Sequence, residues 1–151
     1  MGNYDDLAAE FKANLEAAKA EKRQETTDAS DRLKKDREVV QTVAKDIIQP
    51  ELAKAKQDFA NIDIRVDVNP KTMLNGTTGK NEIVEIDLEC KSRNGLDCGL
   101  HYVFSTPGKI LVLMSLGGGY TPYSKFRDPG EVTATMVNTD IRSFFAEVVK
   151  L

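Results

Sequence analysis

The centre of the chain, residues 84–104, reads VEIDLECKSRNGLDCGLHYVF. Apolar and polar residues alternate on both sides of Arg93-Asn94-Gly95, as they do in two strands that each have one covered face. The dipeptide Asn-Gly is typical of a tight turn between paired strands. The sequence therefore predicts a β-hairpin in the middle of the chain.

The register of this hairpin follows from the length of its loop. If Arg93-Asn94-Gly95 form a three-residue loop, apolar residues face apolar residues along both strands. A two-residue loop would shift the pairing by one residue and destroy that match. We therefore predict the three-residue loop, with Gly95 in the left-handed conformation. The apolar pairs are Cys90–Cys98, Leu88–Leu100, Ile86–Tyr102 and Val84–Phe104.

Further strands are expected on both sides of the hairpin. Residues 62–68 alternate and predict a first strand, and residues 69–81 contain Pro70 and predict a loop. Residues 109–116 are apolar on both faces, which is typical of a central strand covered on both sides by a helix or a partner subunit.

The C-terminal part is expected to hold one more strand and a helix. Residues 117–130 predict an aromatic loop, and residues 131–137 predict a short fifth strand. A last helix should begin with Asn138 or Thr139 as its cap.

The first 60 residues predict helix. Residues 3–60 contain no Gly and only one Pro, Pro50, at which the helix should be interrupted or restarted. One continuous helix over residues 4–49 would be about 70 Å long. A turn near residues 26–28 would instead give a helical hairpin, and the sequence leaves both alternatives open.

The predicted fold class is α+β. A long or hairpinned N-terminal helix occupies residues 1–60, and a four- to five-stranded antiparallel meander with a C-terminal helix packed on it occupies residues 61–151.

Composition excludes several classes of function. Lys and Arg number 21 and Asp and Glu 24, a balance that argues against nucleic-acid binding. The longest apolar run, residues 110–114, is too short to span a membrane. The N-terminus has no basic or apolar segment of a signal peptide, so we expect a cytoplasmic protein.

The two cysteines and the glycines at 117–119 predict no cofactor. Cys90 and Cys98 are expected to be two buried thiols, with a cross-strand disulfide as the alternative, and their spacing is not that of a metal motif. No Lys-Ser or Lys-Thr follows the glycines, so a phosphate-binding loop is not predicted.

His101 is the only histidine, and the predicted register places it opposite Asp87. Together with Glu85 and Glu89, these residues are candidates for a ligand or divalent-metal site. The alternative is a solvated sheet face with cross-strand charge pairs. Because there is no second histidine and no evident nucleophile beside this one, the sequence favours the charge pairs and predicts no metal and no catalytic set.

Two surfaces are candidates for binding a protein partner. The first is the aromatic segment, in which exposed rings and cations are typical interface anchors, although they could also pack over the end of the sheet. Its residues are Tyr120, Tyr123, Lys125, Phe126 and Arg127. The second is a heptad-like helical stripe that could pair in a coiled coil or lie on its own sheet. Its residues are Leu33, Val40, Val43 and Ile47.

The functional hypothesis is a non-enzymatic protein-interaction module that forms a homo-oligomer through its helical region. It depends on the excess helix length, the two-sided apolar strand and the lack of a catalytic set. The alternative is a domain that binds or transforms a small ligand on the sheet face around His101.

Overall fold

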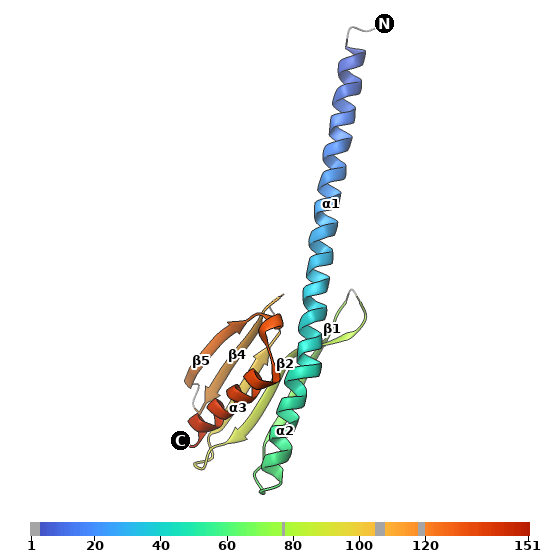
Figure 1. The fold of residues 1–151 in the computed structure, drawn as a ribbon. Helices are drawn as coiled ribbons and strands as arrows, with labels where there is room; N and C mark the ends of the chain where they lie inside the picture. Colours follow the sequence, from blue (N-terminus) through green and yellow to red (C-terminus); the bar gives the residue numbers. More distant parts are fainter. Residues whose placement is uncertain (1–3, 77, 105–107, 118–119) are drawn as a thin grey trace. The chain divides into compact units, whose positions relative to one another are not determined.

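The computed structural model describes residues 4–76, 78–104, 108–117 and 120–151, with all side chains in these ranges except those of residues 25–27, 30 and 120. The fold is α+β, with an N-terminal helical region, a five-stranded antiparallel sheet and a C-terminal helix packed on the sheet (Figure 1). The predicted fold class is confirmed. Contacts within the chain divide it into two units, Met1–Lys35 and Asp36–Leu151.

The N-terminal region forms the long helix and not the helical hairpin. Helix α1 (Asp5–Val43) continues through Thr26 and Thr27, where the hairpin would have turned. The helix contains no Gly or Pro, and Asp5 and Asp6 lie in its first turn, where negative charge favours a helix N-terminus.

Pro50 is accommodated by a change of helix type. A π-helical turn, η1 (Ala44–Ile48), joins α1 to α2 (Gln49–Ala60), and Pro50 lies in the first turn of α2. Proline has no N–H to donate and its ring crowds the carbonyl four residues earlier, so an α-helix cannot pass through it without adjustment. The wider π-helical turn, which ends two residues before Pro50, is that adjustment.

The sheet is a simple meander in which each strand pairs with the next one along the chain (Figure 1). Its order is β1-β2-β3-β4-β5, which places β4 in the interior of the sheet, as predicted. The expected cover on both faces of β4 is not found in the described part of the chain, because alternate residues of this strand are only half-buried. The strands are β1 (Asp67–Leu74), β2 (Asn81–Lys91), β3 (Asp97–Val103), β4 (Ile110–Leu116) and β5 (Tyr120–Arg127).

The central hairpin has the predicted register and loop. Gly95 has a φ of 78°, and the N–H of Ser92 donates to the carbonyl of Leu96 over 2.8 Å to close the three-residue loop. At the far end, the N–H of Phe104 donates to the carbonyl of Val84 over 2.8 Å. The directly paired residues include Cys90–Cys98, Leu88–Leu100 and Ile86–Tyr102.

The predictions for the two edge strands were wrong. Strand β1 begins at Asp67 and runs through Pro70, whereas Ile62 and Ile64 are exposed and lie before it. Strand β5 runs through Pro122, within the segment predicted as an aromatic loop. An edge strand has one side without ladder partners and therefore tolerates a residue without an N–H, so these prolines mark edges of the sheet and not loops.

The segment after β5 also differs from the prediction. It holds a 3-10 turn, η2 (Pro129–Glu131), and not a fifth strand over residues 131–137. Helix α3 (Ala134–Val148) begins before Asn138, and its cap is Thr133, whose hydroxyl accepts a hydrogen bond from the N–H of Met136 over 3.2 Å.

The hydrophobic core lies between one face of the sheet and the helices. Alternate residues of β2, β3 and β4 point to this face, where α3 packs on the sheet and η1 and α2 pack beside it (Figure 1). The rings of Phe59 and Phe145, with centroids 4.2 Å apart, join α2 to α3. The fully buried members include Ile48, Leu52, Ile86, Leu88, Leu100, Tyr102, Val112 and Phe144.

Two polar contacts attach helices to the sheet. The side-chain amide of Gln41 pairs with the backbone of Ile83, with N–O distances of 2.7 and 2.9 Å, beside a β-bulge in the β1–β2 ladder. On α3, the carboxylate of Asp140 accepts hydrogen bonds from both terminal nitrogens of Arg127 and, over 2.7 Å, from the hydroxyl of Tyr102.

The other face of the sheet, which we call the open face, carries the remaining alternate residues. Its half on β1 and β2 is polar, and its half on β4 and β5 is mainly apolar. Leu111 and Leu113 of β4 are half-buried here, whereas their neighbours in the chain are fully buried in the core. The residues of the open face include Lys71, Glu85, Asp87, Glu89, Gly99, His101, Val103, Leu111, Leu113, Ser115, Ser124 and Phe126.

Candidate functional site

Three polar side chains form a chain of hydrogen bonds across the open face. Asp87 of β2 is directly opposite His101 of β3, as predicted, and its Oδ1 lies 2.6 Å from Nδ1 of the imidazole. Nε2 of His101 lies 2.7 Å from Oγ of Ser115 on β4. The order carboxylate, imidazole and hydroxyl is the one in which a histidine can remove the proton of a serine.

The hydrogen bonds define the protonation pattern of a neutral imidazole in this site. A carboxylate can only accept, so Nδ1 of His101 carries the proton and donates it to Asp87. Nε2 then has a free electron pair that accepts a hydrogen bond from the hydroxyl of Ser115.

Gly99 makes room for the imidazole. A Cβ atom at Gly99 would lie 2.6 Å from both Cε1 and Nε2 of His101, which is closer than nonbonded atoms can approach. The ring therefore lies over Gly99, two residues back on the same strand face. Glycine weakens a strand interior, and it is commonly found where another group approaches the backbone closely.

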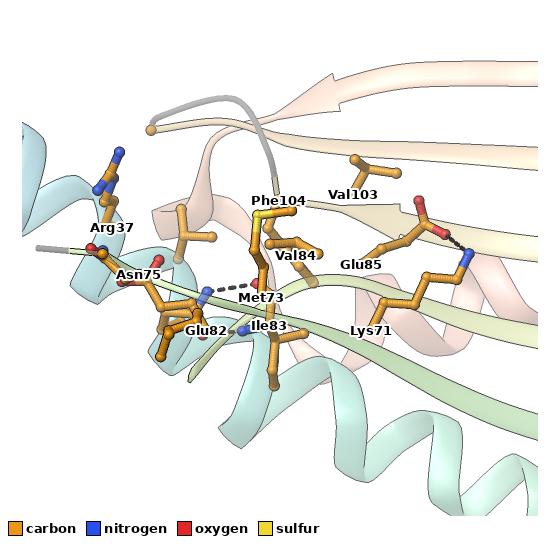
Figure 2. Close-up of a pocket in the computed structure, with 15 residues that line it drawn as sticks. Arg37, Lys71, Met73, Asn75, Glu82, Ile83, Val84, Glu85, Val103 and Phe104 are labelled. Atoms are coloured by element: carbon orange, nitrogen blue, oxygen red, sulfur yellow. Dashed lines mark hydrogen bonds and ion pairs between the residues drawn. The ribbon is translucent and has the colours of Figure 1, made fainter. Parts of the chain in front are cut away.

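Lys71 completes the polar half of the site. Its Nζ lies 2.8 Å from Oε2 of Glu85 and 3.1 Å from Oδ2 of Asp87, so one ammonium group bridges two carboxylates. Figure 2 shows the pair of Lys71 and Glu85. Lys71 lies on β1, within the segment that the sequence predicted as a loop.

These contacts keep the buried carboxylate ionised. Burial by itself raises the pKa of the Asp87 carboxyl, but hydrogen bonds from its neighbours, with His101 the strongest, lower it below its ordinary value. The carboxylates of Glu85 and Asp87 in turn raise the pKa of Lys71. Asp87 is thus a fixed negative charge beside His101.

Three of the four residues predicted for a ligand or metal site converge. Oxygen and nitrogen atoms of Glu85, Asp87 and His101 lie within 4.8 Å of one another. Glu89 does not join them and accepts a hydrogen bond from the amide of Asn69 over 3.0 Å. Lys71 already supplies a positive charge between the two carboxylates, and both ring nitrogens of His101 have partners, so the donor set fits a hydrogen-bonded network better than a metal.

Sequence reasoning missed Ser115, Gly99 and Lys71. Two signals were present, since Ser115 interrupts an otherwise apolar strand and Gly99 lies inside an alternating one. Neither signal locates the site without the register between β3 and β4, which places Gly99 opposite Ser115 and His101 opposite Leu113.

The predicted aromatic surface does not form one patch. Arg127 is buried and bound to Asp140, and Tyr123 is half-buried with its hydroxyl accepting a hydrogen bond from Arg127 over 3.1 Å. Lys125 and Phe126 are exposed but, as neighbours in a strand, point to opposite faces. The side chain of Tyr120 lies outside the described residues.

The four residues predicted for self-association are also divided. Val40 and Val43 are buried in the core of their own sheet, and Ile47 packs against the same core. Only Leu33, which belongs to the unit Met1–Lys35, is exposed. For residues 40–47, the structure therefore supports the alternative in which the helix lies on its own sheet.

A hollow of about 630 Å³ lies between the β1–β2 hairpin and the C-terminal part of α1 (Figure 2). Its walls are mainly apolar, and Arg37 lies at one end and the pair of Lys71 and Glu85 at the other. The amide of Asn75 donates to Glu82 over 2.8 Å at its rim. The apolar lining includes Val40, Met73, Ile83, Val84 and Phe104.

The chain matches no protein-family model, curated protein or solved structure. Among the described residues, no helix combines the length and the apolar character needed to cross a membrane.

Proposed function

We propose that the protein is an interaction module that self-associates through its N-terminal helical region. The observation that carries the proposal is a row of large apolar side chains in the unit Met1–Lys35. Tyr4, Leu7, Phe11 and Leu15 are 74%, 62%, 68% and 46% exposed. Steps of three, four and four residues place all four on one stripe of a helix, and such a stripe is normally covered.

The charges beside this stripe suit a second copy of the same chain. On a wheel of 3.6 residues per turn, Glu10 and Glu21 lie along one side of the stripe, and Lys12 and Lys19 lie along the other. In a parallel pair of identical helices, the acidic side of each helix faces the basic side of its partner. An antiparallel pair would instead bring like charges together, so we propose a parallel coiled-coil dimer.

The stripe proposed here differs from the heptad-like stripe in the sequence, because Val40 and Val43 are already used by the core. Leu33 remains as an exposed residue that could extend the pairing. A dimer of this kind, in the cytoplasm as the sequence suggests, would present two copies of the sheet to a protein partner.

The test is a pair of matched double variants of the full chain. In L7E/F11E, two residues of the stripe become acidic, and in A9E/A13E the same charges are placed on the opposite side of the helix. Burying each large apolar side chain contributes about 1.5–3 kcal/mol, so the stripe variant should weaken dimerisation by at least about 100-fold. The mass of each variant is measured by light scattering on a size-exclusion column.

The control distinguishes the stripe from a general effect of charge. A9E/A13E should remain dimeric at concentrations where L7E/F11E is monomeric. The proposed stripe would be contradicted if both variants dissociated to the same extent, or if both remained dimeric.

A further inference from the structure

We propose that Ser115 is a nucleophile for acyl transfer, with His101 as its general base, and that the open face accepts carboxylic esters with a short apolar acyl group. The proposal develops the possibility of chemistry around His101 and is independent of self-association. It assigns a role to Ser115, which lies on the strand next to His101 and hydrogen-bonds to its Nε2.

The burial of the three side chains suits this role. The carboxylate of Asp87 is 1% exposed and the imidazole of His101 is 20% exposed. Ser115 is partly exposed on the same face. The group that orients the base is thus shielded from water, whereas the hydroxyl can be reached by a substrate.

Two local irregularities surround Ser115. On one side, Gly99 leaves the space in which the imidazole lies. On the other, the β4–β5 register shifts between Met114 and Leu116, so that Thr121 and Pro122 together stand opposite Ser115. A β-bulge interrupts the ladder and is frequently found next to active sites, where it changes the direction of a side chain.

The neighbouring surface indicates the class of substrate. Leu113 stands directly opposite His101, and Leu111 follows on the same face of β4. Phe126, opposite Leu111, is exposed. An apolar acyl chain bound to Ser115 would lie on these side chains, whereas the polar half of the face holds the carboxylates of Glu85 and Asp87 and would repel an acidic substrate.

The reaction needs no further reactant besides water. Oγ of Ser115 forms a bond to the carbonyl carbon of the ester as its proton passes to Nε2 of His101. The bond from that carbon to the alkoxy oxygen then breaks, and the departing alcohol takes the proton from His101. Water, deprotonated in the same way, releases the carboxylic acid and restores Ser115. Asp87 stays ionised and acts as a positioning residue.

In the first experiment, the 151-residue chain is treated with an alkyl fluorophosphonate. Attack by Oγ of Ser115 forms the oxygen–phosphorus bond, fluoride leaves and the proton passes to His101. Peptide mass spectrometry locates the adduct, and Ser124, on the same face, is the internal control. We expect the adduct on Ser115. Its absence there, with the protein folded by circular dichroism, would overturn the proposal whatever the variants do.

Variants then test the mechanism. A general base increases the rate of such a reaction by about 10²–10⁴-fold. H101Q should therefore slow labelling of Ser115 at least about 100-fold, whereas S124A should leave the rate of labelling unchanged. An unchanged rate in folded H101Q would also overturn the proposal. With p-nitrophenyl butyrate as the substrate, S124A should release nitrophenol at the wild-type rate, whereas S115A should release it only at the rate of uncatalysed hydrolysis. Equal rates for the two variants would refute acyl transfer at Ser115.

Discussion

The buried ion pair between β5 and α3 gives the sharpest prediction about stability. Asp140 is 5% exposed and Arg127 8%, and both carboxylate oxygens accept from the guanidinium. The hydroxyl of Tyr102 donates to the same carboxylate over 2.7 Å. The substitution D140A would leave a buried guanidinium and a buried hydroxyl without their acceptor.

The expected loss can be estimated from this geometry. Removing one partner of a buried ion pair costs about 3–5 kcal/mol, because the remaining charge stays desolvated without compensation. With a slope of about 2 kcal/mol per molar urea, the unfolding midpoint of D140A should fall by about 2 M. Urea titrations followed by far-ultraviolet circular dichroism measure this difference. The variant Y102F, which keeps the ion pair, should lose only about 1–2 kcal/mol.

A surface ion pair in the same part of the chain is the matched control. Lys109 and Asp128 are about half exposed, and such pairs contribute about 0–1 kcal/mol. D128A should therefore shift the midpoint only slightly. An equal shift of the urea midpoint in D140A and D128A would contradict a structural role for Arg127. Its predicted role in binding a protein partner would then have to be tested again.

Three further predictions concern the sheet. G99A should keep the fold but lower the free energy of unfolding by about 1–3 kcal/mol, measured by thermal unfolding. It should also stop phosphonate labelling of Ser115, because the new Cβ displaces the imidazole of His101. Normal labelling would contradict the close approach of His101 to Gly99. The pKa of Asp87 is lowered in the folded protein, so its contribution to stability is complete above the ordinary value of 3.8 and is lost as the pH falls through the folded-state pKa. The urea midpoint of the wild type should therefore fall more between pH 5 and pH 3 than that of D87N, and parallel curves would refute this. Burial, and the neighbouring Cys98, raise the pKa of Cys90 from 9.0 to about 11. At pH 8 the thiolate fraction of Cys90 should therefore be about 100-fold lower than that of an ordinary exposed cysteine, and iodoacetamide should alkylate it correspondingly slowly. Alkylation as fast as that of an exposed cysteine would contradict the burial of this thiol.

The central hairpin could be predicted because its information is local. The alternation of residues 84–104 and the dipeptide Asn94-Gly95 determine the strands, the loop and the register together. The pair Asp87–His101 follows directly from that register. Within the unit Asp36–Leu151, helix α3 was also expected, although its beginning was placed too late because Thr133 was not recognised as a cap.

The edges of the sheet could not be predicted in the same way. Pro70 and Pro122 resemble loop residues in the sequence, and only the position of a strand within the sheet decides whether a missing N–H is tolerated. Because residues 69–81 were predicted as a loop, Lys71 was not placed beside Glu85 and Asp87. Because residues 117–130 were predicted as a loop, Arg127 was assigned to the surface. Its partner Asp140 lies on α3, and nothing local in the sequence connects the two residues.

The site around Ser115 depends on three strands at once. Asp87, His101 and Ser115 come from β2, β3 and β4, and the position of Ser115 requires the register of a second hairpin. Pro107-Gly108 predicts a turn between these strands, but residues 105–107 lie outside the described residues, and this dipeptide does not fix the register as Asn-Gly does. Sequence reasoning therefore reached two members of the hydrogen-bonded chain and missed the third.

Sedimentation velocity of the 151-residue chain, with reductant present, is the decisive test of self-association. A dimer that covers the exposed apolar stripe should form as the concentration increases through the micromolar range. The mass should then rise from 16.7 kDa towards twice that value. The stripe consists of Tyr4, Leu7, Phe11 and Leu15. Reductant should not change this result, because the contact is not a disulfide. A mass that stays at 16.7 kDa at concentrations on the order of 100 µM would contradict the proposal.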